Sequence, residues 1–208
     1  MSVKVNFISA MAAAAMLLCF PFNMSADDSG SWLTVQANKS FAKSYAFLRL
    51  EHRSNHNFED TEAMFLATGA GLRLTPWLNT DLSYELWDIN PDITFHKAVL
   101  AASATMVRDG LSVSIKEKLE FAVNPATDAT SFTMRSRLRA QYRIPDSFFR
   151  PYAMAEIFNW SSWIRSLYYV GTEFAIDKHS VFDLYYLYHL PSGGVPVHLI
   201  GAGYFFNF

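Results

Sequence analysis

The chain has 208 residues, a formal net charge of −2 and 51% hydrophobic residues, including 18 Phe, 10 Tyr and 5 Trp. This length favours one sizeable domain, and the charge disfavours a nucleic-acid-binding protein, which usually has a basic surface and a high pI. A helical membrane span needs about 20 consecutive apolar residues, and no such run occurs after residue 22. The apolar residues must therefore follow a different pattern.

The N-terminus has the pattern of a secretory signal peptide. Lys4 supplies a positive charge, a continuous apolar stretch covers residues 7–22, and small residues up to Ala26 precede two aspartates. These are the three regions of an export signal. We expect cleavage near Ala26, so that residues 1–26 are removed and residues 27–208 form one exported domain.

The only cysteine, Cys19, lies within the apolar stretch of this signal. A lipidated Cys19 is a less favoured alternative, because Leu18 is bulky at a position where a lipoprotein signal has a small residue. The exported domain then has no thiol for a disulfide or a cysteine metal site. The sequence also lacks HExxH-type histidine spacing, a P-loop and a GxGxxG motif, so we expect no metal and no other cofactor.

From Trp32 onward, apolar and polar residues alternate with a period of two. The alternation is clearest in residues 78–87, 111–121, 132–143 and 164–177. Period two is typical of a strand whose two faces meet different environments. These segments are about 10 to 14 residues long, whereas strands of soluble proteins most often have about 5 to 6. A transmembrane strand needs roughly 9 to 11, so the length favours a membrane barrel.

Eleven segments are expected to be strands of an all-β, antiparallel, up-and-down transmembrane barrel with ten to twelve strands. In chain order they lie near 31–38, 44–54, 62–74, 78–88, 94–107, 111–122, 131–144, 150–160, 163–177, 181–190 and 196–208. Bacterial single-chain barrels have even strand numbers. We therefore expect that 31–38 is not a full barrel strand, or that one strand was missed or split. The least regular segment is 94–107, and Glu117 falls on an otherwise apolar face.

The connections between these segments also alternate in character. Short connections are expected at 75–77, 108–110, 144–146 and 177–180, and longer or more polar ones at 55–61, 88–92, 124–129 and 191–194. Outer-membrane barrels have short periplasmic turns and longer outer loops. The pattern therefore predicts an orientation, with the short connections in the periplasm.

The last six residues predict a terminal strand with an aromatic face. Tyr204, Phe206 and Phe208 share one face and follow Gly203. A strand of this form resembles the C-terminal signal that the outer-membrane assembly machinery recognises. Together with the export signal, it predicts a protein of the bacterial outer membrane, with membrane lipid and that machinery as its partners.

Strand parity places charged residues of both signs on the face opposite to the apolar one, where a barrel has its lumen. These residues are Arg49, Glu51, Arg53, Arg73, Asp81, Glu85, Lys116, Lys118, Glu120, Arg135, Arg137, Arg139, Arg143, Glu156, Arg165, Glu173 and Asp183. Opposite charges paired across strands contribute roughly 0.2–1 kcal/mol each. A largely filled, non-enzymatic lumen is the favoured interpretation. The alternative is a narrow pore for small polar or anionic solutes along Arg135, Arg137 and Arg139.

A lipid-modifying outer-membrane enzyme is a further alternative. His198 and Ser166 both face outward by parity, near the outer ends of their strands. A Ser–His pair catalyses acyl transfer only within hydrogen-bond reach. We do not expect these two strands to be neighbours, and His198 is also interpretable as an interfacial residue beside Tyr188.

Several segments resemble a family of small outer-membrane β-barrel proteins known as domain-of-unknown-function family 2490. The similarity is strongest after Phe132 and weaker at Trp32 and 49–53. The matching segments are 134–139, 142–146, 150–153, 156–159, 180–188 and 198–201. The resemblance implies an outer-membrane barrel and no particular activity.

Overall fold

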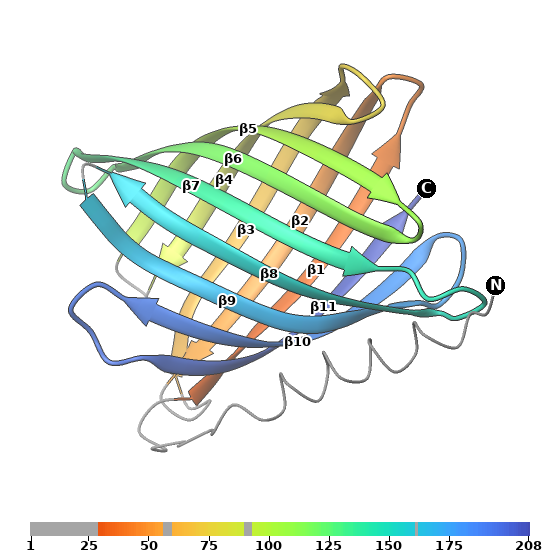
Figure 1. Ribbon diagram of the computed structural model, residues 1–208. Coiled ribbons are helices and arrows are strands. Elements are labelled where there is room, and N and C mark those ends of the chain that lie inside the picture. The colour runs from red at the N-terminus through yellow and green to blue at the C-terminus, as the bar shows by residue number, and fades with distance from the viewer. Residues whose placement is uncertain (1–28, 56–59, 90–92, 161) are drawn as a thin grey trace.

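The computed structural model describes residues 29–55, 60–89, 93–160 and 162–208 (Figure 1). The signal peptide expected at 1–26 lies outside these residues. No helix in the described ranges is long and apolar enough to cross a membrane.

The described residues form eleven long strands, and each expected segment corresponds to one of them. They are β1 Ser29–Ser40, β2 Ser44–Asn55, β3 Asp60–Arg73, β4 Leu78–Ile89, β5 Ile93–Arg108, β6 Leu111–Asn124, β7 Ala129–Tyr142, β8 Phe149–Trp160, β9 Ser162–Ala175, β10 Ser180–Pro191 and β11 Val197–Asn207.

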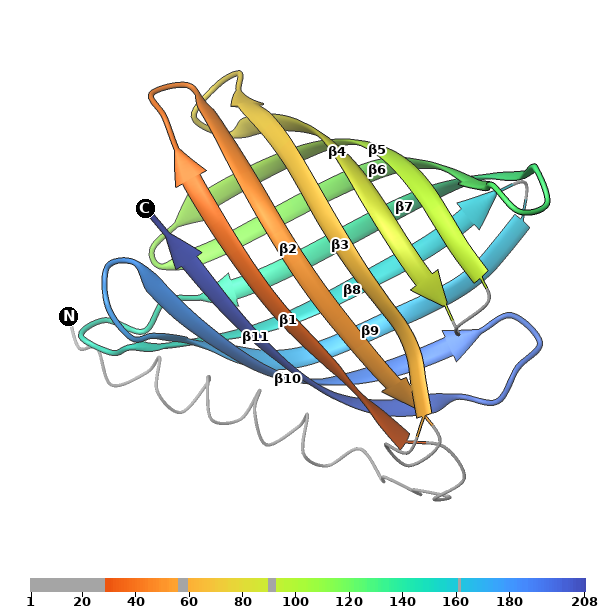
Figure 2. The ribbon, with the colours of Figure 1, turned by 180° about the vertical axis from the view of Figure 1, so that it is seen from behind.

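These strands form one closed barrel in which neighbours in sequence pair antiparallel (Figures 1 and 2). The expected all-β, up-and-down barrel of ten to twelve strands is therefore confirmed. The expectation of an even strand number is wrong, because β1 is a full strand and closes the barrel by pairing parallel with β11, from Ser29 opposite His198 to Asn38 opposite Asn207. Up-and-down strands of odd number leave the first and last pointing the same way. The parallel pairing still provides hydrogen-bond partners for the backbone groups at the edges of both β1 and β11.

Odd closure also places the two ends of the barrel chain at opposite rims. The N-terminal rim contains Ser29 and the adjoining ends of the strand pairs β2/β3, β4/β5, β6/β7, β8/β9 and β10/β11. The C-terminal rim contains Phe208 and the connections β1–β2, β3–β4, β5–β6, β7–β8 and β9–β10, which include the short ones expected from the sequence. One of these is a two-residue turn in which Asp109 and Gly110 have φ values of 49° and 84°. Positive φ at both positions is the type I′ geometry that suits a twisted hairpin.

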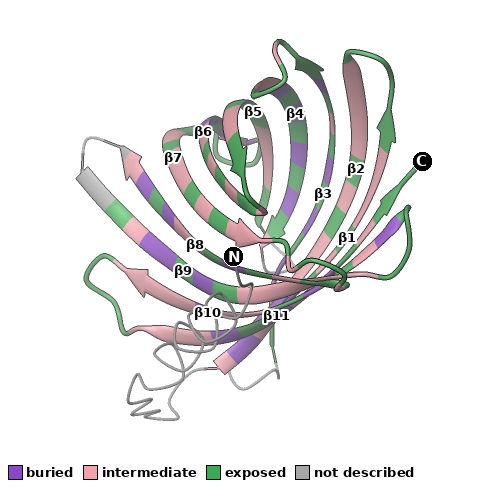
Figure 3. Ribbon diagram, turned by 45° about the vertical axis from the view of Figure 1, so that its right-hand side comes forward, coloured by how far each residue is buried: buried purple, intermediate pink, exposed green. Residues whose placement is uncertain are grey.

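The barrel wall has an inner face that is buried and an outer face that is exposed. Along β4, Asp81 is 6% exposed whereas its neighbour Leu82 is 62% exposed. Figure 3 shows the same alternation of buried and exposed residues along β3 and β4. On β4 the charged residue therefore lies inside and the apolar residue outside, the reverse of the arrangement in a soluble protein.

Large apolar side chains also lie inside the barrel. One buried cluster contains Trp32, Tyr152, Phe158, Leu167, Tyr169, Leu187 and Leu199. A second contains Ala63, Phe65, Ala67 and Trp87. Close packing here requires a glycine, because a Cβ at Gly201 would lie 2.0 Å from the Tyr185 ring. The interior is thus packed by both charged and apolar groups.

Candidate functional site

The lumen contains the charged residues expected there. The structure places these on the inner face, buried or partly buried: Arg49, Glu51, Arg53, Lys116, Lys118, Glu120, Arg135, Arg137, Arg139, Glu156 and Glu173. Of the other expected charges, Arg73 and Arg143 are exposed at the C-terminal rim, whereas Asp81, Glu85, Arg165 and Asp183 lie deeper. Contact with a solute stays a prediction for all of them.

Glu156 on β8 is the centre of the largest ion-pair group. Its side chain is fully buried, and its two oxygens accept hydrogen bonds from Arg135 and Arg137 on the neighbouring strand β7. Arg135 also lies 3.6 Å from Glu120. The Tyr169 hydroxyl donates to Glu156 at 3.3 Å. A buried carboxylate is tolerated only with such partners. The strand parity, which turns both arginines inward, and their ion pairs with Glu156 therefore together determine where the two side chains lie.

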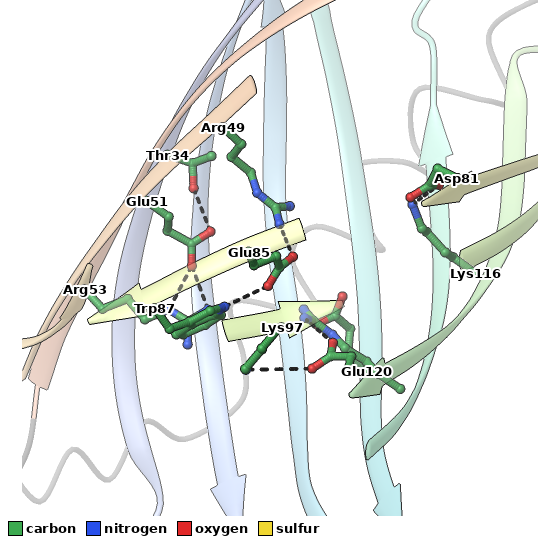
Figure 4. Close-up of polar contacts among 12 residues, drawn as sticks. Thr34, Arg49, Glu51, Arg53, Asp81, Glu85, Trp87, Lys97, Lys116 and Glu120 are labelled. Atoms are coloured by element: carbon green, nitrogen blue, oxygen red, sulfur yellow. Dashed lines mark hydrogen bonds and ion pairs between the residues drawn. The ribbon is translucent and has the colours of Figure 1, made fainter. Parts of the chain in front are cut away.

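A second group joins β2 to β4 (Figure 4). Glu85 accepts hydrogen bonds from Arg49 at 2.9 Å and from the Trp87 indole at 2.8 Å, and Figure 4 shows its carboxylate between them. On β2, Arg53 pairs with Glu51 at 2.6 Å. These donors occupy the carboxylate oxygens on this side of the lumen.

Two further carboxylates lie toward the C-terminal rim. Asp81 accepts from Lys116 at 2.9 Å (Figure 4). Glu173 accepts from Arg139 at 2.6 Å. The arginines expected to form an anion pathway, Arg135, Arg137 and Arg139, are therefore each bound to a carboxylate.

Aromatic rings cover several of the lumen cations. The guanidinium of Arg53 lies 3.8 Å from the ring centroid of Trp32 and 4.7 Å from that of Trp87. The ammonium group of Lys97 on β5 lies 3.9 Å from the ring centroid of Trp87 on the neighbouring strand β4. Cation–π contacts of this kind contribute roughly 0.5–2 kcal/mol.

Sequence reasoning missed two lumen cations and the apolar part of the lumen. Lys97 lies on β5, where Val99 and Ala101 on the inner face are as apolar as the outer face, so the alternation was weak. Arg150 has the same parity as Glu156 on β8, and the period alone could have identified it. Leu167 also faces inward, and because its side chain is apolar, the alternation of polar and apolar residues could not identify it as a lumen residue.

Glu117 on β6 faces outward, as its position in the sequence indicated. It accepts a hydrogen bond of 2.6 Å from the Ser136 hydroxyl on β7. Apart from Thr80, the residues around it are apolar: it lines a groove of 290 Å³ with Thr80, Leu100, Ala101, Ala102, Leu119 and Met134. The hydrogen bond reduces the cost of a carboxylate on this face.

Ser166 and His198 do not form a catalytic pair. They lie on β9 and β11, which are separated by β10, and Ser166 is opposite Leu190 whereas His198 is opposite Tyr188. His198 is hydrogen-bonded through Nδ1 to the Tyr186 hydroxyl. Two strand spacings separate the two strands, roughly 9–10 Å, which exceeds hydrogen-bond reach.

The terminal strand has the aromatic face expected of it. Tyr204, Phe206 and Phe208 are 41%, 40% and 52% exposed on the outer surface, while Gly203 is buried on the inner face. The Phe208 amide donates to the Asn38 carbonyl at 3.0 Å, which joins the chain end to β1. Recognition of this strand by an assembly machinery stays a prediction.

Comparison with known proteins gives one family. A family model described as "Protein of unknown function (DUF2490)" matches residues 29–193, which is well over half of the chain and runs from β1 to the β10–β11 connection. No curated protein matches the chain. Among the described residues, no group of three or more His, Cys, Asp or Glu side chains could hold a metal ion.

Proposed function

The chain belongs to the family "Protein of unknown function (DUF2490)", and from its own geometry we propose that it is a bacterial outer-membrane barrel with a closed lumen and no enzymatic activity. Its role is that of a membrane-embedded structural protein, and not of a diffusion pore.

The observation that best supports placement in a membrane is the apolar outer face of the barrel wall. The outer face presents large apolar side chains around the whole barrel, among them Leu33, Leu50, Leu66, Leu82, Leu100, Ile115, Leu138, Leu184 and Ile200, each at least 41% exposed. Soluble monomers rarely expose contiguous apolar patches above a few hundred Å². Lipid is the solvent that favours such a face, and strands of 11 to 16 residues are long enough to cross it.

The closed lumen is supported by the burial of its central groups. Glu156 and Leu187 are both 0% exposed, and they lie on β8 and β10. A water-filled channel would leave inner-face side chains accessible to solvent. The arginines expected to form an anion pathway, Arg135, Arg137 and Arg139, are each bound to a carboxylate and are therefore not free to bind a passing anion.

Insertion and orientation can be tested by labelling single cysteines, because Cys19 is the chain's only cysteine and lies in the expected signal peptide. Ser192→Cys lies on the exposed β10–β11 connection, and Lys43→Cys lies on the exposed β1–β2 connection at the opposite rim. In intact cells, a membrane-impermeant maleimide should label Ser192→Cys and should label Lys43→Cys only after the outer membrane is permeabilised.

Each variant is first checked for recovery in the outer-membrane fraction and for gel mobility that changes on heating. Labelling of Lys43→Cys alone in intact cells would reverse the proposed orientation. Recovery of the wild-type protein as a soluble periplasmic monomer would contradict the membrane placement itself.

A further inference from the structure

A pocket with an excess of hydrogen-bond donors lies near the C-terminal rim, on the inner face of the barrel. Its volume is 190 Å³, and it is lined by Val107, Gly110, Ser112, Gln141, Arg143 and Arg150. Ser112 and Gln141 lie directly opposite each other on β6 and β7. The Arg143 amide donates to the Gly110 carbonyl at 2.8 Å, which holds Arg143 at the mouth of the pocket.

These donors lack acceptors among the described residues. The Arg150 Nε and the Gln141 Nε2 atoms are buried and have no hydrogen-bond partner there. No ion pair within the described ranges involves Arg143 or Arg150, in contrast to Arg135, Arg137 and Arg139. Buried donors without acceptors cost free energy, so the pocket favours a ligand that supplies acceptors.

The nearby carboxylates do not fill this role. Glu173 lies opposite Arg150 across β8 and β9, but it accepts the hydrogen bond of Arg139 at 2.6 Å. On the next strand, the Asp183 Oδ2 atom accepts the hydrogen bond of the Tyr152 hydroxyl at 3.0 Å, and the buried Asp183 Oδ1 atom has no donor, Arg150 included, among the described residues. Two arginines therefore line the pocket, and neither is bound to a carboxylate within the described ranges.

We propose that this pocket binds a small oxyanion of the phosphate-monoester class. Guanidinium groups match the oxygens of phosphate in a two-pronged geometry, and the Gln141 amide and Ser112 hydroxyl add two more donors. Val107 forms an apolar part of the wall, suited to a short carbon group attached to the phosphate. The phosphate can belong to a soluble compound or to a lipid headgroup, and the pocket chemistry is the same for both.

The test is a calorimetric titration of inorganic phosphate and of glycerol phosphate into the full-length barrel, refolded in an uncharged detergent. We expect saturable binding that weakens about tenfold in Arg150→Gln and in Arg143→Gln, equivalent to roughly 1.4 kcal/mol each. Gln141→Ala, which changes no charge, should also weaken binding. The matched control is Arg108→Gln at the same rim, since Arg108 is 92% exposed and outside the pocket.

Loss of affinity in Arg108→Gln equal to that in Arg150→Gln would overturn the proposal, because rim charge alone would then explain binding. Absence of saturable heat in the wild-type protein would overturn it as well. Unchanged heat-dependent gel mobility verifies that each variant is folded. A second titration of glycerol phosphate, with the barrel in phosphatidylcholine nanodiscs, identifies the source of the phosphate. If phosphatidic acid added to the nanodiscs weakens the binding of glycerol phosphate, the pocket accepts a lipid phosphate. If it does not, the pocket binds a soluble phosphate compound.

Discussion

The replacement Glu156→Gln tests whether the ion-pair group holds the interior of the barrel together. The amide keeps the shape of the side chain but removes the charge that binds Arg135 and Arg137. Arg135 keeps Glu120 at 3.6 Å, whereas Arg137 retains no ion pair among the described residues. Loss of one partner from a buried pair costs about 3–5 kcal/mol.

The Arg137 side chain is 27% exposed, so water can partly solvate it and the cost should lie near the lower limit. We expect the free energy of unfolding to fall by about 3 kcal/mol. The assay is urea unfolding in detergent micelles, followed by tryptophan fluorescence and by heat-dependent gel mobility. Adding Arg137→Gln to the variant should cost less than Arg137→Gln alone, a coupling of about 1 kcal/mol or more.

The matched control is Arg108→Gln, which removes an ion pair whose side chains are both 92% exposed. Exposed pairs contribute at most about 1 kcal/mol, so this variant should unfold like the wild-type protein. If Glu156→Gln unfolds within about 0.5 kcal/mol of that control, the ion-pair group does not stabilise the lumen and the reasoning is wrong.

Three further predictions concern other parts of the barrel. Gly201→Ala should lower the free energy of unfolding by about 1–3 kcal/mol through contact with the Tyr185 ring; Tyr185→Ala in the same chain should recover part of that loss, and no recovery would exclude this clash. Glu117→Leu should raise stability by about 1 kcal/mol in lipid vesicles, whereas a loss there would place that face in a polar environment. Phe208→Ala should reduce the assembled fraction in outer membranes more than Phe41→Ala at the same rim, and equal yields would contradict a terminal recognition signal.

Much of the fold follows from the period of two. Because each strand buries one face, the alternation of polar and apolar residues predicted the position of every strand, including the irregular β5 at 93–108. The closure could not be derived in this way, because it depends on pairing between β1 and β11, which are far apart in sequence. Parallel closure of an odd barrel has no local signal in either strand.

The same period assigned the lumen charges to the inner face but not their contacts. The sequence could not show that Glu156 is shared by two arginines of β7, because strand register determines which residues are opposite one another. It also could not show that Leu167 and Leu187 fill the lumen, because an apolar side chain can lie on either face of this barrel wall. Packing across the lumen places them inside.

The closed lumen is tested most directly by the electrical conductance of the wild-type barrel in a planar lipid bilayer. Heat-dependent gel mobility of protein recovered from the same lipid verifies that folded barrels are present. The account predicts no stable conductance steps, because Glu156 and Leu187 are fully buried in the interior. Regular, ohmic steps from the wild-type protein would show a continuous water path and would contradict it.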